Sequence, residues 1–343
     1  MKKLLNTLYV TTPDAYLSLD GENIVVRRDE AELTRVPLHN LEAVVTFGYT
    51  GASPALMAAC ATRGVALTFL SKSGRFLASI AGEMQGNVLL RKTQYRISDS
   101  EPDSLKIARN MLAAKLHNSR WVLDRATRDH ELVINAKGIR AAAEQIANAI
   151  PLVRETLDLE ALRGIEGEAA SRYFSVFDEL ILRDKDSFSF VSRNRRPPMD
   201  NVNAMLSLTY TLLANDCAAA LSTVGLDPYI GFLHRDRPGR KSLALDLMEE
   251  LRAPLADRFV LRLINNRQMD ASDFYTKENG AVMLKDDARR KFLSAWQTRK
   301  QEELKHPYLG GKISWGLVPH AQALLLARYL RADLDGYPPF MWK

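Results

Sequence analysis

The pattern of hydrophobic positions changes once along the chain, from strand-like runs to helical periodicity. Up to residue 82, short runs rich in β-branched and aromatic residues alternate with turn signals, which predicts strands. One helix is predicted among them, because Ser53 is a good N-cap, Pro54 suits the first helical position and Gly64 can end the helix. The predicted strands are 4–10, 16–19, 24–26, 44–47, 65–70 and 75–77.

Beyond residue 82 the apolar residues recur with a period of about 3.6, which predicts helices. The pattern therefore predicts a β-rich N-terminal domain over 1–82, a hinge over 83–92 and a larger helical domain over 93–343. The predicted helices are 105–125, 141–149, 157–182, 205–221, 243–251, 286–304 and 319–330.

Composition narrows the class of protein. The chain has 343 residues, 46% of them apolar and 26% charged, which excludes disorder as its main state. Two cysteines exclude a disulfide scaffold and a Cys-based zinc cluster, and they suit a reducing cytosol, so a cytoplasmic protein is expected. No apolar run approaches the roughly 20 residues of a membrane span. The net charge of +6 is a weak indication of a polyanionic partner.

One acidic residue lies on the apolar face of its predicted helix. Helical spacing places Glu166 inside that stripe, where an unpaired carboxylate costs several kcal/mol and needs a cation, a partner or a proton. Gly164 and Gly167 bracket it and permit close approach by another backbone or a ligand. The alternative is a core ion pair with Arg163 or Arg172.

A histidine and two acids form a second polar group. His234 ends an apolar segment, and Asp246 and Glu249 follow at helical spacing, so that their carboxylates project on one side. The alternative is an ordinary solvated face of an amphipathic helix. Together, Glu166, His234 and Glu249 can form a mixed oxygen and nitrogen site for one divalent ion. Carboxylates favour Mg²⁺ or Mn²⁺, and the imidazole favours Mn²⁺.

Two basic segments accompany these residues. Each has few or no acids, and each suits contacts with DNA phosphates, although such loops are also commonly just solvated. The basic residues are Arg193, Arg195 and Arg196 in the first segment, and Arg235, Arg237, Arg240 and Lys241 in the second.

Four motifs resemble those of the CRISPR adaptation integrases, the metal-dependent DNA endonucleases that insert new spacers into repeat arrays. The likeness covers nearly the whole chain. The motifs are Gly-Ile-Glu166-Gly, Gly-Leu-Asp-Pro-Tyr229-Ile-Gly-Phe-Leu-His234, Ser-Leu-Ala-Leu-Asp246-Leu-Met-Glu249-Glu, and Arg193-Asn-Arg195-Arg196-Pro-Pro with Asn201-Val-Asn-Ala-Met-Leu-Ser.

The resemblance implies an α+β fold, with a small β-sandwich-like N-terminal domain followed by a larger all-α catalytic domain. It implies that Glu166, His234 and Glu249 are both catalytic residues and ligands of Mg²⁺ or Mn²⁺, with Asp246 as a supplementary ligand or an outer partner. It also implies that the 3′-hydroxyl ends of short duplex DNA are joined to repeat phosphodiesters by transesterification. The implied partners are double-stranded DNA, a second copy bound through the β-domain, and a small second adaptation protein in a heterohexameric-type complex.

Two other functions compete with an integrase. An architectural DNA-binding protein would use its acids only to stabilise helices, and its DNA binding would persist without any metal-dependent product. A metal hydrolase of small phosphoesters would turn over such substrates without appreciable duplex binding at physiological salt. Strand transfer of short duplexes into a supercoiled repeat plasmid separates the integrase from both.

Overall fold

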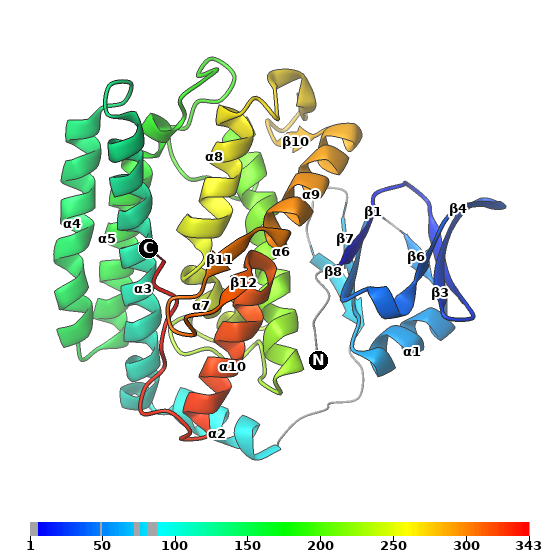
Figure 1. Ribbon diagram of the computed structural model, residues 1–343, viewed down its shortest axis with the longest axis horizontal. Helices are drawn as coiled ribbons and strands as arrows, with labels where there is room; N and C mark the ends of the chain where they lie inside the picture. Colours follow the sequence, from blue (N-terminus) through cyan, green and yellow to red (C-terminus); the bar gives the residue numbers. More distant parts are fainter. Residues whose placement is uncertain (1–5, 49, 72–75, 81–87, 343) are drawn as a thin grey trace. The chain divides into compact units, whose positions relative to one another are not determined.

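The computed structural model describes residues 6–48, 50–71, 76–80 and 88–342, and the chain divides into two compact units. Unit 1 contains Met1–Gly86 and Leu284–Glu302, and unit 2 contains Asn87–Met283 and Glu303–Lys343. Most of the described strands lie in unit 1 and most of the helices in unit 2 (Figure 1). The predicted α+β class and its β-first, helix-second order are therefore confirmed.

Unit 1 is built on two four-stranded sheets. The first has the order β1 (Thr7–Val10), β5 (Ala43–Phe47), β7 (Ala66–Leu70) and β8 (Phe76–Ile80). Its first three strands are parallel, and β8 pairs antiparallel with β7. The second sheet has the order β4 (Ala31–Pro37), β3 (Asn23–Arg28), β2 (Tyr16–Asp20) and β6 (Gly51–Ala52).

One hydrophobic core joins the two sheets to helix α1 (Pro54–Arg63). Leu17 and Ile24 come from the second sheet and Leu67 from the first, and all three are fully buried. The predicted helix ends are confirmed: the Ser53 hydroxyl accepts a hydrogen bond from the Leu56 N–H, and Gly64 adopts a φ of 68°.

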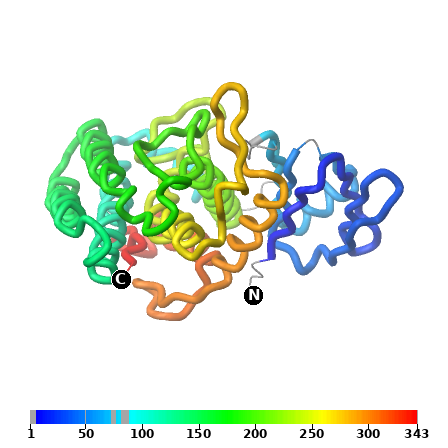
Figure 2. The backbone as a smooth tube through the Cα atoms, turned by 90° about the horizontal axis from the view of Figure 1, so that it is seen from above, coloured from blue at the N-terminus to red at the C-terminus, as the bar shows by residue number. Residues whose placement is uncertain are grey.

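Unit 2 is a helical body in which three helices lie side by side, as both views show (Figures 1 and 2). These are α3 (Glu101–His130), α4 (Ala136–Glu155) and α5 (Leu159–Ser175). The other helices are α2 (Val88–Asp99), α6 (Asn201–Thr223), α7 (Ser242–Glu249), α8 (Arg258–Asn265) and α10 (Val318–Leu330). Two short hairpins, absent from the sequence-based prediction, pair β9 (Phe274–Thr276) with β10 (Val282–Leu284) and β11 (Glu303–Lys305) with β12 (Lys312–Ser314).

Helix α6 is apolar on nearly every side. Among the described residues it alone has the length and composition of a membrane span, with a mean hydropathy of 1.2 over 18 residues, but 61% of that window is buried inside the protein. A helix that is hydrophobic all round suits the centre of a helical body. It packs against α10 and against α7, the helix that carries Glu249.

The predicted elements differ from the structure in several places, and β4 and α8 were not predicted at all. Residues 88–92 of the predicted hinge form the start of α2, and 83–87 lie outside the described residues. The helix predicted over 157–182 ends at Ser175, because the chain then tightens into a 3₁₀ turn that keeps the apolar spacing. Helix α9 (Asp286–Gln301) belongs to unit 1, where the Arg290 Nε donates to the Thr11 hydroxyl over 3.1 Å.

Candidate metal and DNA site

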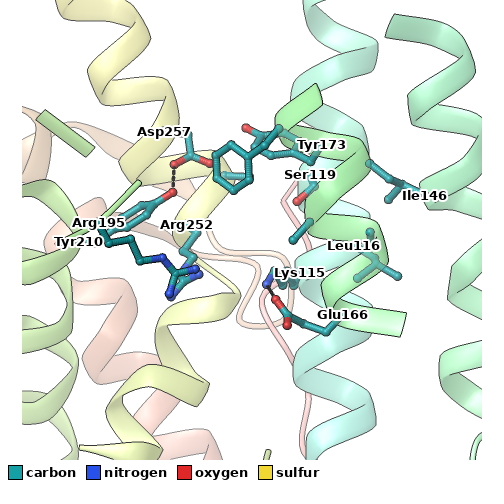
Figure 3. Close-up of a pocket in the computed structure, with 14 residues that line it drawn as sticks. Lys115, Leu116, Ser119, Ile146, Glu166, Tyr173, Arg195, Tyr210, Arg252 and Asp257 are labelled. Carbon is teal, nitrogen blue, oxygen red and sulfur yellow. Dashed lines mark hydrogen bonds and ion pairs between the residues drawn. The ribbon is translucent and has the colours of Figure 1, made fainter. Parts of the chain in front are cut away.

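Glu166 lies in the middle of α5, which begins where the Asp158 carboxylate accepts a hydrogen bond from the Ala161 N–H. Its carboxylate contacts the ammonium of Lys115 on α3 (Figure 3). The expected cation is therefore present, but it is neither Arg163 nor Arg172. Arg163 donates to the Leu233 carbonyl over 2.7 Å, and Arg172 lies 3.7 Å from Glu168.

The two glycines beside Glu166 leave space open. A Cβ added to Gly164 or to Gly167 would meet no atom within 4 Å. No described part of the chain therefore makes the close approach that glycine permits at these positions.

Lys115 also contacts a second carboxylate. Its Nζ lies 2.7 Å from the Oε2 of Glu249, a side chain that is 2% exposed at the end of α7. The guanidinium of Arg252 lies 3.2 Å from the other oxygen of Glu249. Burial raises the pKa of Glu249, but Arg252 and Lys115 outweigh burial and hold that pKa below its ordinary value. Glu249 therefore remains a carboxylate at neutral pH.

His234 is oriented by Asp246. The His234 Nδ1 lies 2.5 Å from the Oδ1 of Asp246, an arrangement in which Nδ1 donates to that carboxylate. The Nε2 atom lies 3.9 Å from the Oε1 of Glu249. A histidine whose far nitrogen donates to a carboxylate is the usual arrangement in protein metal sites.

Asp246 is fully buried, and its carboxylate accepts hydrogen bonds from one loop. Its Oδ2 accepts from the backbone N–H groups of Phe232 and Leu233, over 2.6 and 3.0 Å, and its Oδ1 accepts from the N–H of His234 over 3.0 Å. A Cβ on Gly231 would lie 2.8 Å from Oδ2, so only glycine permits this approach. These contacts place Asp246 as the partner that orients His234.

Buried hydrogen bonds fix the segments that carry these side chains. Gln94 is fully buried on α2, and its amide bonds the Asp227 and Ile230 carbonyls and the Asp227 N–H, which holds the loop before His234. Beyond α7, the carboxylate of Glu250 accepts from the Tyr337 hydroxyl over 2.6 Å. Both contacts reach across more than 80 residues and were not predicted from sequence.

Two of the three predicted ligands, Glu166 and Glu249, thus share one ammonium group, and the third, His234, lies beside Glu249. In the part of the chain that the structure describes, no three His, Cys, Asp or Glu side chains form a ready metal cluster. The cation between Glu166 and Glu249 is instead Lys115. A positive group held by two carboxylates, with an imidazole nitrogen beside them, marks a position where a divalent cation would find suitable donors.

A pocket opens beside this group, lined among others by Lys115, Glu166, Arg195, Arg252 and Asp257 (Figure 3). Its volume of about 40 Å³ suits water or an ion. The Tyr210 hydroxyl donates to the Asp257 carboxylate over 2.5 Å on its far side. Burial raises the pKa of Asp257 to about 6.

The basic residues of the first segment differ in their surroundings. Arg193 is held inside the protein, because its guanidinium donates to the Asn203 side chain over 2.6 Å and to the Ser207 hydroxyl over 3.1 Å. Burial lowers the pKa of Arg193. Arg195 and Arg196 are exposed, and Arg195 also lines the pocket.

The second basic segment follows His234. Arg235 and Arg237 are exposed, and Arg235 pairs with Glu160 at the start of α5. Arg240 and Lys241 are half-buried, and burial lowers the pKa of each. Arg235 and Arg237 are therefore more accessible to a ligand than the last two residues.

Comparison with known proteins identifies relatives over the full length. The sequence profile of the family described as CRISPR associated protein Cas1 matches residues 8–298. CRISPR-associated endonuclease Cas1 1 of Chlorobaculum tepidum is 50% identical over 343 residues, which is 100% of both chains. CRISPR-associated endonuclease Cas1 2 of Rhodospirillum rubrum is 51% identical over 347 residues, again with 100% of both chains covered.

Two solved structures share the fold. A Cas1 protein from Thermotoga maritima, 21% identical, has a TM-score of 0.82 over 96% of this chain and 98% of that one. A casposase bound to its integration product, 22% identical, has a TM-score of 0.84 over 98% and 94% of the two chains. The family profile and the identity to full-length relatives together show that the chain belongs to the CRISPR-associated Cas1 family.

Proposed function

We propose that this chain is a metal-dependent DNA endonuclease and integrase of CRISPR adaptation, which joins 3′-hydroxyl ends of short duplex DNA to repeat phosphodiesters. The relatives that match its full length are named CRISPR-associated endonucleases. The observation that supports the proposal is that Glu166 and Glu249, from two helices far apart in the sequence, share the Lys115 ammonium, with His234 next to Glu249.

The donor set fits Mg²⁺ or Mn²⁺. Glu166 and Glu249 would supply carboxylate oxygens and His234 its Nε2. The Asp246 carboxylate, bonded to Nδ1, would hold the imidazole in the tautomer that leaves Nε2 for the ion. A bound divalent ion would polarise the phosphoryl oxygen and stabilise charge on the attacking and leaving oxygens. Arg252 and Arg195 line the adjoining pocket and add positive charge where an anionic phosphate would enter.

The same residues suit two related outcomes at phosphorus. When a DNA 3′-hydroxyl attacks the phosphodiester, one P–O bond forms as another breaks, and a strand is joined. When water attacks at the same site, the strand is cut. Three protein ligands leave positions open for the phosphate and the attacking oxygen, which a catalytic metal site requires.

The proposed DNA contacts are the exposed arginines beside the site. Arg195, Arg196, Arg235 and Arg237 present their charges to solvent, whereas Arg193 is used to anchor its loop. The half-buried Arg240 and Lys241 would add positive charge near Arg235 and Arg237. Phosphate contacts of this kind give affinity and register without reading sequence.

A salt titration tests the first arginine pair. The double replacement Arg195→Ala and Arg196→Ala should weaken binding of a short duplex and reduce the slope of log affinity against log salt by about 1 to 2, since each lost phosphate contact removes about one unit. Fluorescence anisotropy measures both. The control is Arg120→Ala with Arg128→Ala, which removes the same charge from exposed positions on α3. An unchanged slope in the first variant would remove that loop from the DNA surface.

The proposed partners are double-stranded DNA, a second copy joined through the N-terminal β-domain, and a small second adaptation protein. One structure that shares this fold, with a TM-score of 0.82, is named a Cas6-RT-Cas1–Cas2 complex, and the chain spans about a third of that polypeptide. The decisive experiment mixes the chain with a small second adaptation protein, short duplex DNA and a supercoiled repeat plasmid. Metal-dependent joining at the repeat supports the proposal, whereas duplex binding without any joined or cut product contradicts it.

A further inference from the structure

Lys115 is a buried cation inside the candidate site. Its side chain is 9% exposed and projects from an otherwise apolar part of α3, where Met111, Leu112 and Leu116 are buried. Burying an ammonium is costly unless anions compensate it. Two carboxylates do so here, Glu166 and Glu249, the latter over 2.7 Å. One lysine therefore ties α3 to both α5 and the end of α7.

The ammonium and a divalent ion would compete for the same space. An ion coordinated by Glu166 and Glu249 would lie within contact distance of the Lys115 Nζ, since that atom already contacts both carboxylates. Like charges at such a separation repel strongly in a desolvated site. Arg252 adds a further positive charge beside Glu249, at 3.2 Å, so the two carboxylates are already balanced by two cations.

We propose that Lys115 is a positioning residue that acts as a built-in counter-cation. Its ammonium holds Glu166 and Glu249 together in the metal-free protein, and a divalent ion binds by displacing it. This inference rests on the proposed function, which assigns the two carboxylates to a metal. It goes further by making metal binding an exchange of cations, so that the lysine stabilises the empty site and lowers its affinity for the ion.

The test compares full-length wild type with Lys115→Met by calorimetric titration with MnCl₂. The variant should bind Mn²⁺ roughly tenfold more tightly or better, because no ammonium must leave. In EDTA its thermal midpoint should fall, because the buried Glu249 and the half-buried Glu166 lose their shared partner, and saturating Mn²⁺ should restore it. Lys106→Met is the matched control on the same helix, since Lys106 pairs with Asp103 at an exposed position, over 2.9 Å. It should change neither property.

The proposal stands or fails on whether Lys115→Met binds Mn²⁺ more tightly than the wild type does. A lysine with only a structural role would leave a distorted site that binds Mn²⁺ no better than wild type, and that result would overturn the exchange. If the wild type binds Mn²⁺ and Glu166→Gln does not, the metal site stands even when the Lys115 variant fails the prediction. If neither the wild type nor the Lys115 variant binds Mn²⁺, the proposed metal-dependent function fails along with the exchange.

A second substitution covers the case in which Lys115→Met does not fold. Lys115→Gln removes the charge but keeps an amide donor for one carboxylate, so it retains part of the link between α3 and its neighbours. It should also bind Mn²⁺ more tightly than wild type. Affinity equal to or weaker than that of the wild type would contradict the proposal.

Discussion

Replacing Glu166 by Gln is expected to reduce strand transfer about a thousandfold or more, to the background of the assay. The substitution keeps the size of the side chain and removes the charge that the proposed ion requires, and a thousandfold loss corresponds to about 4 kcal/mol of transition-state stabilisation. Joining of short duplexes into a supercoiled repeat plasmid measures the effect. Duplex binding should be retained, because the change removes a negative charge and adds none.

Glu168→Gln is the matched control. Glu168 lies on the same helix two residues away, and its side chain is 73% exposed, with only a distant pairing to Arg172 at 3.7 Å. That variant should join strands at close to the wild-type rate. Retention of more than a tenth of the activity in Glu166→Gln would contradict the role of Glu166 as a ligand. Loss of folding, seen by circular dichroism, would favour the alternative of a core ion pair with Lys115.

Replacing Asp246 by Asn is expected to weaken Mn²⁺ binding by about 10- to 100-fold and to destabilise the protein by about 1–3 kcal/mol. The carboxylate accepts hydrogen bonds from three backbone N–H groups and from His234, all in a fully buried position. An amide supplies one oxygen and turns an NH₂ group toward donors. The His234 ring then loses the partner that fixes its tautomer, so its Nε2 is no longer reliably available to a metal.

Calorimetry with MnCl₂ and thermal unfolding in EDTA measure the two effects separately. Asp236→Asn serves as the control, because that residue is exposed in the basic turn two positions after His234. It should leave both properties unchanged. Wild-type Mn²⁺ affinity in Asp246→Asn would show that the orienting hydrogen bond is unimportant for the site.

Sequence patterns predicted many of the helices and strands and their capping residues. They did not predict which elements far apart in the chain pack together. The helix over Pro54–Arg63 was predicted with both ends, because its cap residues are adjacent in sequence. The assignment of α9 to unit 1 was missed, because its contact with Thr11 joins residues 279 positions apart. The start of helix α2, residues 88–92, was taken for part of a hinge, although Leu90 within it is buried.

The two glutamates that contact Lys115 were predicted from sequence, whereas Lys115 itself and Arg252 were not. Glu166 was identified because it lies on an apolar helix face, and its need for a cation followed from burial. Lys115 satisfies that need from 51 residues earlier. The same reasoning, applied to α3, would have found it, since Lys115 lies within a largely buried stretch between Leu112 and Leu116. Its two partners could not have been named from spacing alone.

The arginines show the limit of reading charge from sequence. Arg193, Arg195 and Arg196 are equivalent members of a basic run in the sequence. In the structure, the first is folded inward onto Asn203 and lies 5.2 Å from the Tyr210 ring centre, while the other two remain exposed. The path of the loop in the folded chain decides which arginine anchors the loop and which arginines remain available to a phosphate.

We propose that Glu166, His234 and Glu249 hold one divalent ion. Crystals of the full chain soaked in MnCl₂ test it directly, because the anomalous signal of manganese locates the ion without reference to the protein. We expect a peak about 2 Å from a carboxylate oxygen of each glutamate and from the Nε2 of His234, with the Lys115 ammonium moved away. Crystals that contain Mn²⁺ elsewhere, but show no peak here and Lys115 still between the two carboxylates, would contradict it.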